Sequence, residues 1–136
     1  MQKILVVDDA QMNRELLHDI LEEDYAVEMA EDGEQAVRKL KEYEGAVAAL
    51  LLDLRMPRMD GFAVLDAMGK EGLLRRVPVL IITGEHAAEI ENRCFELGVS
   101  DFIQKPFESS IVKKRVKNAV ELFAYKNRLE QKVMEQ

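Results

Sequence analysis

Five short apolar runs alternate with five helical patterns along this chain of 136 residues. Several of the runs are apolar throughout, which is typical of strands buried on both faces of a sheet. The expected strands are Ile4–Val7, Ala26–Ala30, Val47–Asp53, Val79–Thr83 and Phe102–Ile103. Strands that alternate with helices predict a parallel sheet with helices on both faces. Because crossover connections are right-handed, we expect an α/β, doubly wound, five-stranded parallel sheet in the order 2-1-3-4-5.

The helices between these strands are expected where apolar residues recur at helical spacing. The first helix is expected over Asn13–Glu23, and its apolar face consists of Leu16, Leu17, Ile20 and Leu21. The other patterns lie around Ala36–Leu40, Phe62–Met68 and Ile90–Leu97, and from Ser109 onward. Glycines at 45, 72 and 98 follow three of these patterns, and glycine often stands just past a helix C-terminus.

Length, charge and cysteine content limit what the chain can be. A chain of this length fits one domain and can bury roughly two thirds of its unfolded surface. The net charge of −7 argues against a surface built to bind nucleic acid. Cys94 is the single cysteine, which excludes a disulfide framework, and we expect it to be a small core residue. Because no secretory signal and no apolar run of ~18 residues is present, we expect a soluble cytoplasmic protein without a membrane partner.

Polar side chains stand where the expected strands end. Asp8 and Asp9 follow the first strand, and Asp53 ends the third. Thr83 ends the fourth strand, and Lys105 follows the fifth. The carboxyl ends of parallel strands meet at one edge of the sheet, where ligands bind in open α/β folds. We therefore expect these five groups to converge at that edge.

Three carboxylates in one crevice repel one another. Two unit charges ~4 Å apart cost about 4 kcal/mol at an effective dielectric near 20. Lys105 supplies one positive charge, and Mg²⁺ is the natural supplement, because it commonly uses one or two carboxylates together with waters and phosphate. Thr83 can donate a hydrogen bond to a phosphoryl oxygen while Lys105 contacts another. The set suits phosphoryl transfer to Asp53, because carboxylate nucleophiles can form aspartyl phosphates.

Four short motifs occur in order along the chain: Val7–Asp9, Asp53–Gly61, Ile82–Gly84 and Asp101–Phe107. Together they are far more specific than any one of them alone. With these motifs the chain resembles the receiver domain of bacterial response regulators. The resemblance implies a flavodoxin-like receiver domain over residues 1–122, belonging to a two-component system or phosphorelay. Residues 123–136 are then a C-terminal helical extension, either a linker or a dimerisation helix.

The resemblance implies roles for the residues at the expected edge. Asp53 matches the phosphoacceptor, which takes a phosphoryl group from the phosphohistidine of a histidine kinase or of a phosphotransfer protein. Asp8 and Asp9 match the acidic pair that holds Mg²⁺, to which Asp53 and the backbone carbonyl of Arg55 also contribute. Lys105 matches the lysine that contacts the phosphoryl group. The family signals as a phosphoacceptor that assists its own phosphotransfer and dephosphorylation, rather than as an enzyme.

The resemblance also implies a switch. Thr83 matches the hydroxyl that turns toward the phosphoryl group, and Phe102 matches the aromatic ring that then turns inward. The face built from the fourth helix, the fifth strand and the last helix would then change, and so control an output domain or partner protein that is absent from this chain. The positions of Arg55 and Glu85 tune dephosphorylation in the family, by controlling how the attacking water is admitted.

The last helical pattern continues past the receiver motifs. Residues 123–136 contain no proline or glycine, and Leu122, Leu129 and Val133 extend an apolar stripe that Lys126 interrupts. One interpretation is a helix that leads to an output domain or pairs two chains; the other is a solvated tail. A homodimer would form through this helix or through the switch face described above.

A basic cluster on the last helix consists of Lys113, Lys114, Arg115 and Lys117. No helix-turn-helix or winged module accompanies it, so nucleic acid is not an expected partner of this chain and a solvated face is the simplest interpretation. Glu89, Glu91 and Glu96 of a second subunit are an alternative partner for the cluster. Such exposed pairs are worth ~0–1 kcal/mol each, so they would set orientation more than affinity.

Other functions also fit an aspartate at a strand end. A hydrolase of the haloacid dehalogenase type uses an Asp nucleophile with Mg²⁺, but it has a second Asp two residues on, where this chain has Arg55. A flavodoxin-like flavin binder would place a phosphate among three carboxylates, which repel it. A degenerate receiver is not expected, because every chemical position is filled. The helix that runs to Gln136 favours a fragment of a longer regulator over a stand-alone receiver.

Overall fold

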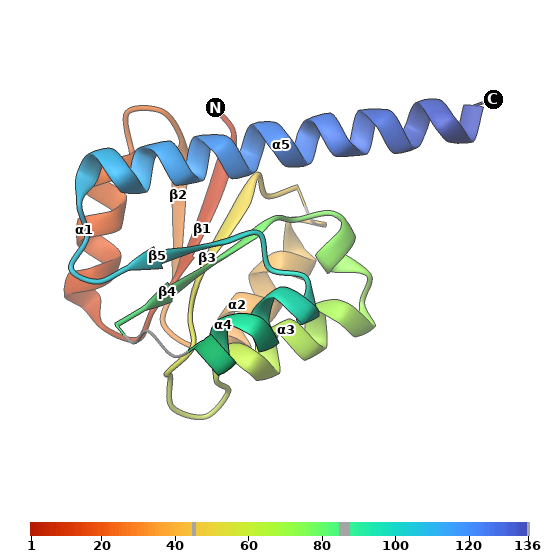
Figure 1. Ribbon diagram of the computed structural model, residues 1–136. Coiled ribbons are helices and arrows are strands. Elements are labelled where there is room, and N and C mark those ends of the chain that lie inside the picture. The colour runs from red at the N-terminus through yellow and green to blue at the C-terminus, as the bar shows by residue number, and fades with distance from the viewer. Residues whose placement is uncertain (45, 85–87, 136) are drawn as a thin grey trace.

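One parallel sheet forms the centre of the molecule. The computed structural model describes residues 1–44, 46–84 and 88–135, without the side chains of residues 131 and 133–135. The strands are β1 (Lys3–Val7), β2 (Ala26–Ala30), β3 (Ala49–Asp53), β4 (Val79–Thr83) and β5 (Asp101–Gln104). They lie in the order β2-β1-β3-β4-β5 and pair in parallel throughout (Figure 1). The predicted fold class and strand order are confirmed.

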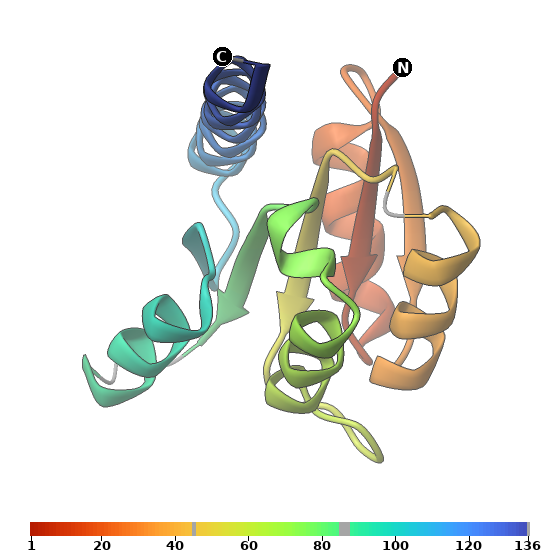
Figure 2. The same ribbon diagram turned by 90° about the vertical axis from the view of Figure 1, so that its right-hand side faces the viewer.

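Helices cover both faces of this sheet (Figure 2). They are α1 (Gln11–Leu21), α2 (Gly33–Glu42), α3 (Gly61–Lys70), α4 (Ala88–Leu97) and α5 (Ser109–Glu135), with a short 3₁₀ helix η1 (Leu73–Arg75) after α3. Side chains of α1 and α5 pack on one face, and those of α2, α3 and α4 pack on the other. Over the described residues, no helix combines the length and the apolar character needed to cross a membrane.

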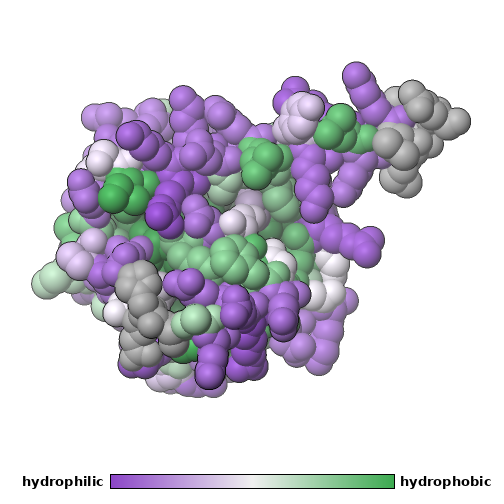
Figure 3. Space-filling view, viewed as in Figure 1, coloured by the Kyte–Doolittle hydropathy of each residue, from purple (hydrophilic) through white to green (hydrophobic). Residues whose placement is uncertain are grey.

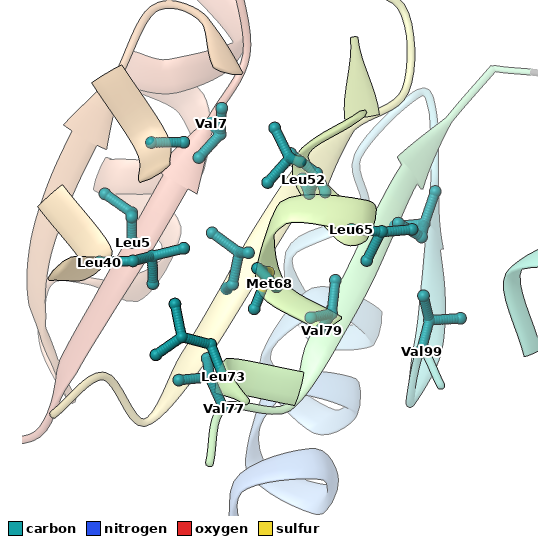
Figure 4. Close-up of a cluster of buried hydrophobic side chains, with 14 of the residues drawn as sticks. Leu5, Val7, Leu40, Leu52, Leu65, Met68, Leu73, Val77, Val79 and Val99 are labelled. Carbon is teal, nitrogen blue, oxygen red and sulfur yellow. The ribbon is translucent and has the colours of Figure 1, made fainter. Parts of the chain in front are cut away.

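The central strand β3 is buried on both faces. Alternate side chains of a strand point to opposite faces, so Leu52 joins the cluster under α2 and α3, which also contains Leu65 and Met68 (Figure 4). Leu51 joins the cluster under α1 and α5 on the other face. All residues of β3 are buried, which explains why the sequence shows a continuous apolar run rather than an alternating one. The last residue of this buried strand is Asp53.

Several element boundaries differ from the predicted ones. The structure begins α1 at Gln11 and ends it at Leu21, where the sequence predicts Asn13–Glu23. The N-cap residue Ala10 makes no side-chain capping hydrogen bond, so the sequence carries no start signal there. Strand β3 begins two residues later than predicted, and β5 is longer by one residue at each end. Position 45, predicted to end α2, lies outside the described residues.

The predicted apolar face of α1 is partly wrong. Leu17 and Leu21 are fully buried, but Leu16 is 46% exposed, because it lies to one side of the face that meets the sheet. The prediction for Cys94 is confirmed: its side chain is buried in the cluster on the α4 side of the sheet. Burial raises the pKa of this thiol, as expected for an inert core cysteine.

Helix α5 is one continuous helix that passes beyond the end of the sheet (Figure 1). Its first half is anchored, because Val112, Val116, Ala119 and Val120 are buried in the core. Arg115 ties α5 to β5: one guanidinium nitrogen donates to the Phe102 carbonyl at 2.8 Å and lies 3.3 Å from the Asp101 carboxylate. The division into residues 1–122 and 123–136 stays a prediction, since the helix runs through that boundary without a break.

Candidate functional site

A cleft of about 530 Å³ lies at the carboxyl edge of the sheet. Parallel strands deliver their C-terminal residues to this edge, and the sequence predicts a convergence of polar groups there. The predicted residues that line the cleft are Asp8, Asp9, Asp53, Arg55, Thr83 and Lys105. They come from the ends of β1, β3, β4 and β5 and from the loop after β3, so the fold brings together residues that are far apart in the sequence.

Asp53 and Lys105 face each other across the cleft. The Lys105 ammonium lies 3.8 Å from an Asp53 carboxylate oxygen and 3.9 Å from an Asp8 oxygen. Asp53 is 6% exposed and Asp8 is fully buried, whereas Asp9 is exposed. The other Asp53 oxygen accepts a hydrogen bond of 3.2 Å from the Arg55 N–H. One positive charge thus serves two buried carboxylates.

The pKa of Asp53 is raised from the ordinary 3.8 to about 6. Burial is the largest cause, because it disfavours the charged form, and the negative charge of Asp8 adds to it. The Arg55 N–H and the Lys105 charge lower the pKa in part. At neutral pH Asp53 is therefore mostly ionised, and its negative charge is only partly compensated by these two groups.

Three residues at the start of α1 hold Asp8 in place. The Ala10 N–H donates to one carboxylate oxygen at 2.9 Å, and the Asn13 side-chain amide donates to the other at 3.1 Å. Arg14 donates to the backbone carbonyl of Asp8 at 2.8 Å. Sequence reasoning missed Asn13 and Arg14; the available signal is their place one helical turn after the strand-end aspartate, which puts them beside it.

The acidic residues fit a hard divalent cation. Asp8, Asp9 and Asp53 each offer one carboxylate oxygen, and these three oxygens lie within 4.8 Å of one another. An all-oxygen set of this kind suits Mg²⁺, which keeps several of its waters and binds through one or two carboxylates. The excess of negative charge over the Lys105 charge favours the same conclusion.

The loop after β3 needs a glycine to reach this geometry. Gly61 opens α3, and a Cβ on it would lie 2.7 Å from the Asp53 carbonyl oxygen and 2.7 Å from the Leu54 Cα. Its N–H donates to the Leu54 carbonyl at 3.0 Å, which closes the loop. The side chain of Asp60 then caps α3 by accepting from the Ala63 N–H at 2.9 Å. Gly61 thus holds the end of the loop against the backbone of Asp53 and Leu54.

One predicted site residue, Phe102, stands apart from the cleft. Phe102 is 8% exposed and packs in the core under α4, with its ring edge against the Phe95 ring at a centroid distance of 5.1 Å. Glu85, the predicted partner of Arg55 in dephosphorylation, lies outside the described residues.

Phe62 of α3 and Ile90 of α4 line the cleft although sequence reasoning assigned them to helix cores. The Arg93 guanidinium lies 4.0 Å from the centroid of the Phe62 ring, which links α4 to α3 at this wall.

The sequence of the chain matches one family over most of its length. The model of that family, described as the response regulator receiver domain, matches residues 4–117. The chain belongs to the response regulator receiver family. The receiver is 40% identical over 118 residues to the transcriptional regulatory protein ResD of Bacillus subtilis, a match that covers 85% of this chain and 46% of ResD. It is 33% identical over 113 residues to a probable cyclic di-GMP phosphodiesterase of Vibrio cholerae, covering 83% of this chain and 25% of that protein.

Solved structures show the same fold. The receiver superposes on the chemotaxis protein CheY4 of Vibrio cholerae with a TM-score of 0.81 and 28% identity, covering 88% of this chain and 98% of that chain. NtrX from Brucella abortus gives a TM-score of 0.85 and 30% identity, covering 96% of this chain and 29% of that chain. The predicted family is confirmed. The receiver spans less than half the length of the two curated relatives named above, so it corresponds to one part of those proteins.

Proposed function

We propose that Asp53 of this receiver accepts a phosphoryl group from the phosphohistidine of a histidine kinase or of a phosphotransfer protein, in a Mg²⁺-dependent reaction. Membership of the receiver family supports a phosphoacceptor role for the chain. The observation that carries the choice of residue is the buried Asp53 carboxylate, which ends the central strand and faces the Lys105 ammonium at 3.8 Å. Asp8 is more deeply buried, and both of its carboxylate oxygens already accept hydrogen bonds, one from the Ala10 N–H and one from the Asn13 side chain.

The chain's own residues support an in-line transfer. An Asp53 oxygen attacks phosphorus, the P–N bond of the phosphohistidine breaks, and the bonding electrons leave with the imidazole, which takes up a proton. Lys105 contacts one phosphoryl oxygen, and the Thr83 hydroxyl donates to another. At neutral pH a carboxyl with a pKa of about 6 is mostly ionised, so Asp53 is ready as the nucleophile. Phosphoryl transfer depends mainly on positioning and charge stabilisation of this kind.

Asp8, Asp9, Asp53 and the backbone carbonyl of Arg55 would hold the Mg²⁺ ion. When bound, the ion supplies positive charge that neutralises the phosphoryl oxygens and offsets the repulsion between the carboxylates. The support for this metal set is the cluster of three carboxylate oxygens within 4.8 Å of one another. Arg55 also lines the cleft, and with Glu85 it is proposed to govern how water reaches the phosphorylated Asp53.

Phosphorylation is proposed to act on the face made by α4, β5 and α5. Thr83 would move toward the phosphoryl group, and the Phe102 ring would follow. Phe102 is placed to link these elements, because its ring meets Phe95 of α4 and its carbonyl accepts from Arg115 of α5. If the Phe102→Ala variant bound its partner with unchanged dependence on phosphorylation, the aromatic part of this switch would be wrong.

The proposed output lies in a further domain of a longer protein or in a separate partner. The relatives ResD and the probable phosphodiesterase are each longer than the part that this chain matches, and their names describe different outputs. The proposed division of the chain is a receiver over residues 1–122 and a helical extension over residues 123–136 that links to the output or pairs two chains.

Intact mass spectrometry tests the proposed chemistry. The receiver is incubated with acetyl phosphate and Mg²⁺, and then with a phosphorylated histidine kinase domain in place of acetyl phosphate. We expect one phosphoryl adduct, which is absent in Asp53→Asn and absent when EDTA removes the metal. Asp66→Asn is the matched control, because Asp66 is an exposed aspartate on α3 that pairs with Lys70. An adduct that persists in Asp53→Asn would refute the assignment of the phosphoacceptor.

A further inference from the structure

The cleft at the carboxyl edge of the sheet has two chemically different sides. On the α1 side its lining is polar and includes Asp8, Asp9 and Asn13. On the other side the lining includes residues of α3 and α4, which pack on the opposite face of the sheet from α1 (Figure 2). The phosphotransfer proposed above uses the polar groups of the cleft and gives this second side no role.

Three apolar side chains line the cleft on the α3 and α4 side. Leu54 follows β3, Phe62 lies in the first turn of α3, and Ile90 lies in α4. All three are partly buried and pack on the hydrophobic cluster beneath these helices. We call these three residues the apolar wall. Because their side chains neither donate nor accept hydrogen bonds, the wall offers a water molecule no side-chain partner.

An interaction between the two helices holds the Phe62 ring in place. The Arg93 guanidinium lies 4.0 Å from the centroid of this ring, which is a cation–π contact. Arg93 stands three residues after Ile90, so the two side chains leave α4 on the same side. Arg93 is exposed and does not itself line the cleft. Its contact with the Phe62 ring therefore connects it to the cleft.

We propose that the apolar wall slows the hydrolysis of phosphorylated Asp53, with Phe62 as the main barrier to water and Arg93 as the positioning residue that holds its ring. This inference rests on the proposed phosphorylation of Asp53. In the hydrolysis a water oxygen bonds to phosphorus, and the bond between phosphorus and the Asp53 oxygen breaks. The electron pair of that bond stays on the Asp53 carboxylate, the water gives up a proton to the solvent, and inorganic phosphate leaves.

The position of Asp53 explains why the wall affects this reaction. Asp53 is 6% exposed and ends the buried strand β3, so its phosphoryl group projects from the sheet edge into the cleft. The attacking water must lie roughly in line with the bond that breaks, on the cleft side of the phosphorus. Apolar side chains beside that position exclude water from the site. Phe62 has the largest side chain in the wall, so it excludes the most water.

The decay of the phosphoryl adduct tests the proposal. The receiver is phosphorylated with acetyl phosphate and Mg²⁺, the donor is removed by gel filtration, and the adduct is followed by intact mass spectrometry with Mg²⁺ present. We expect Phe62→Ala to shorten the half-life of the adduct about tenfold. Arg93→Gln should shorten it about threefold, the size expected for the loss of one exposed cation–π contact. Arg93→Lys keeps a cation and should retain most of the native half-life.

Two matched controls lie far from the cleft. Phe123→Ala removes another partly buried ring, which lies on α5 beside Val99 at the opposite end of the sheet. Arg128→Gln removes another exposed guanidinium, on the helix α5 whose end projects from the body of the molecule (Figure 3). Both variants should keep the native half-life, because neither changes the lining of the cleft.

A double variant tests whether Arg93 acts through Phe62. Once Phe62→Ala has removed the ring, adding Arg93→Gln should cause no further acceleration. A general loss of stability would instead make the two effects add. Arg93→Gln changes an exposed position, so it tests the wall independently if Phe62→Ala does not fold.

The outcomes separate this inference from the proposed function. If the native receiver forms no adduct, the phosphorylation of Asp53 is refuted, and the role of the wall with it. If the adduct forms but decays at the native rate in both Phe62→Ala and Arg93→Gln, the wall is refuted while the phosphorylation of Asp53 stands. Acceleration in Phe62→Ala alone, or additive effects in the double variant, would refute the positioning role of Arg93.

Discussion

The raised pKa of Asp53 makes a prediction about stability that needs no phosphoryl donor. The folded receiver holds the Asp53 proton up to about pH 6, whereas the unfolded chain releases it near the ordinary value of 3.8. The folded state therefore binds more protons between these two values. The Asp53 carboxyl therefore makes the free energy of unfolding fall as the pH rises from about 4 to about 6, and it causes no further loss above about pH 6.

The magnitude comes from the same two values. The difference between about 6 and 3.8, at about 1.4 kcal/mol for each pH unit, is about 3 kcal/mol. The side-chain amide introduced in the Asp53→Asn variant does not titrate, so the variant lacks this loss. We expect the stability of Asp53→Asn relative to the native receiver to rise by about 3 kcal/mol between pH 3.5 and pH 7 and to stay constant at higher pH.

Urea unfolding in EDTA measures this difference at each pH, because EDTA removes metal that would stabilise the native carboxylates. Subtracting the two curves cancels the titration of groups that do not interact with residue 53. The control is Asp66→Asn on the exposed side of α3, for which the difference should be nearly flat. If the Asp53→Asn difference were the same at pH 3.5 and pH 7, burial and the Asp8 charge could not be acting on Asp53 as described.

Three other substitutions test the packing around the site. Gly61→Ala should destabilise the receiver by about 1–3 kcal/mol in thermal unfolding, because the new Cβ would lie 2.7 Å from the backbone at the end of β3. The control is Gly69→Ala in the same helix, which should leave the Tm unchanged or higher, because the atom nearest to the new Cβ is the Leu74 Cδ1 at 3.6 Å. Leu51→Ala removes a fully buried side chain of β3 and should cost about 2–5 kcal/mol in urea unfolding, whereas a loss under 1 kcal/mol would mean that the core repacks. Asp32→Ala removes the carboxylate that caps α2 by accepting from the Gln35 N–H at 2.8 Å, and should lower the free energy of unfolding by about 1 kcal/mol. An unchanged urea midpoint would contradict this expectation.

The sheet and its polar edge could be predicted from the sequence because both depend on patterns that survive local variation. A buried parallel strand must be apolar on both faces, so β3 and β4 appear as continuous apolar runs. The right-handed crossover rule then orders the strands and brings Asp8, Asp53 and Lys105 to one edge. The approximate position of each of these three side chains follows from its place at the end of a strand.

The remaining details depend on contacts that one sequence does not show. Helix α1 begins at Gln11 without a capping side chain, so its start had no signal. The contribution of Asn13 to the site depends on the angle at which α1 leaves β1, which apolar periodicity does not encode. The exposure of Leu16 depends on the same angle. The switch roles assigned to Thr83 and Phe102 came from the family resemblance alone and stay predictions.

The link between β5 and α5 also bears on how the receiver avoids unwanted strand pairing. β5 is the outermost strand on its side of the sheet, and such a strand can template the addition of another chain. At Phe102 that template is already occupied, because the N–H donates to the Asp101 carboxylate at 2.8 Å and the carbonyl accepts from Arg115 at 2.8 Å. The Arg115–Asp101 ion pair thus uses the backbone groups of Phe102 that a sixth strand would need. It also places two charged side chains where an incoming β-strand would pair with β5.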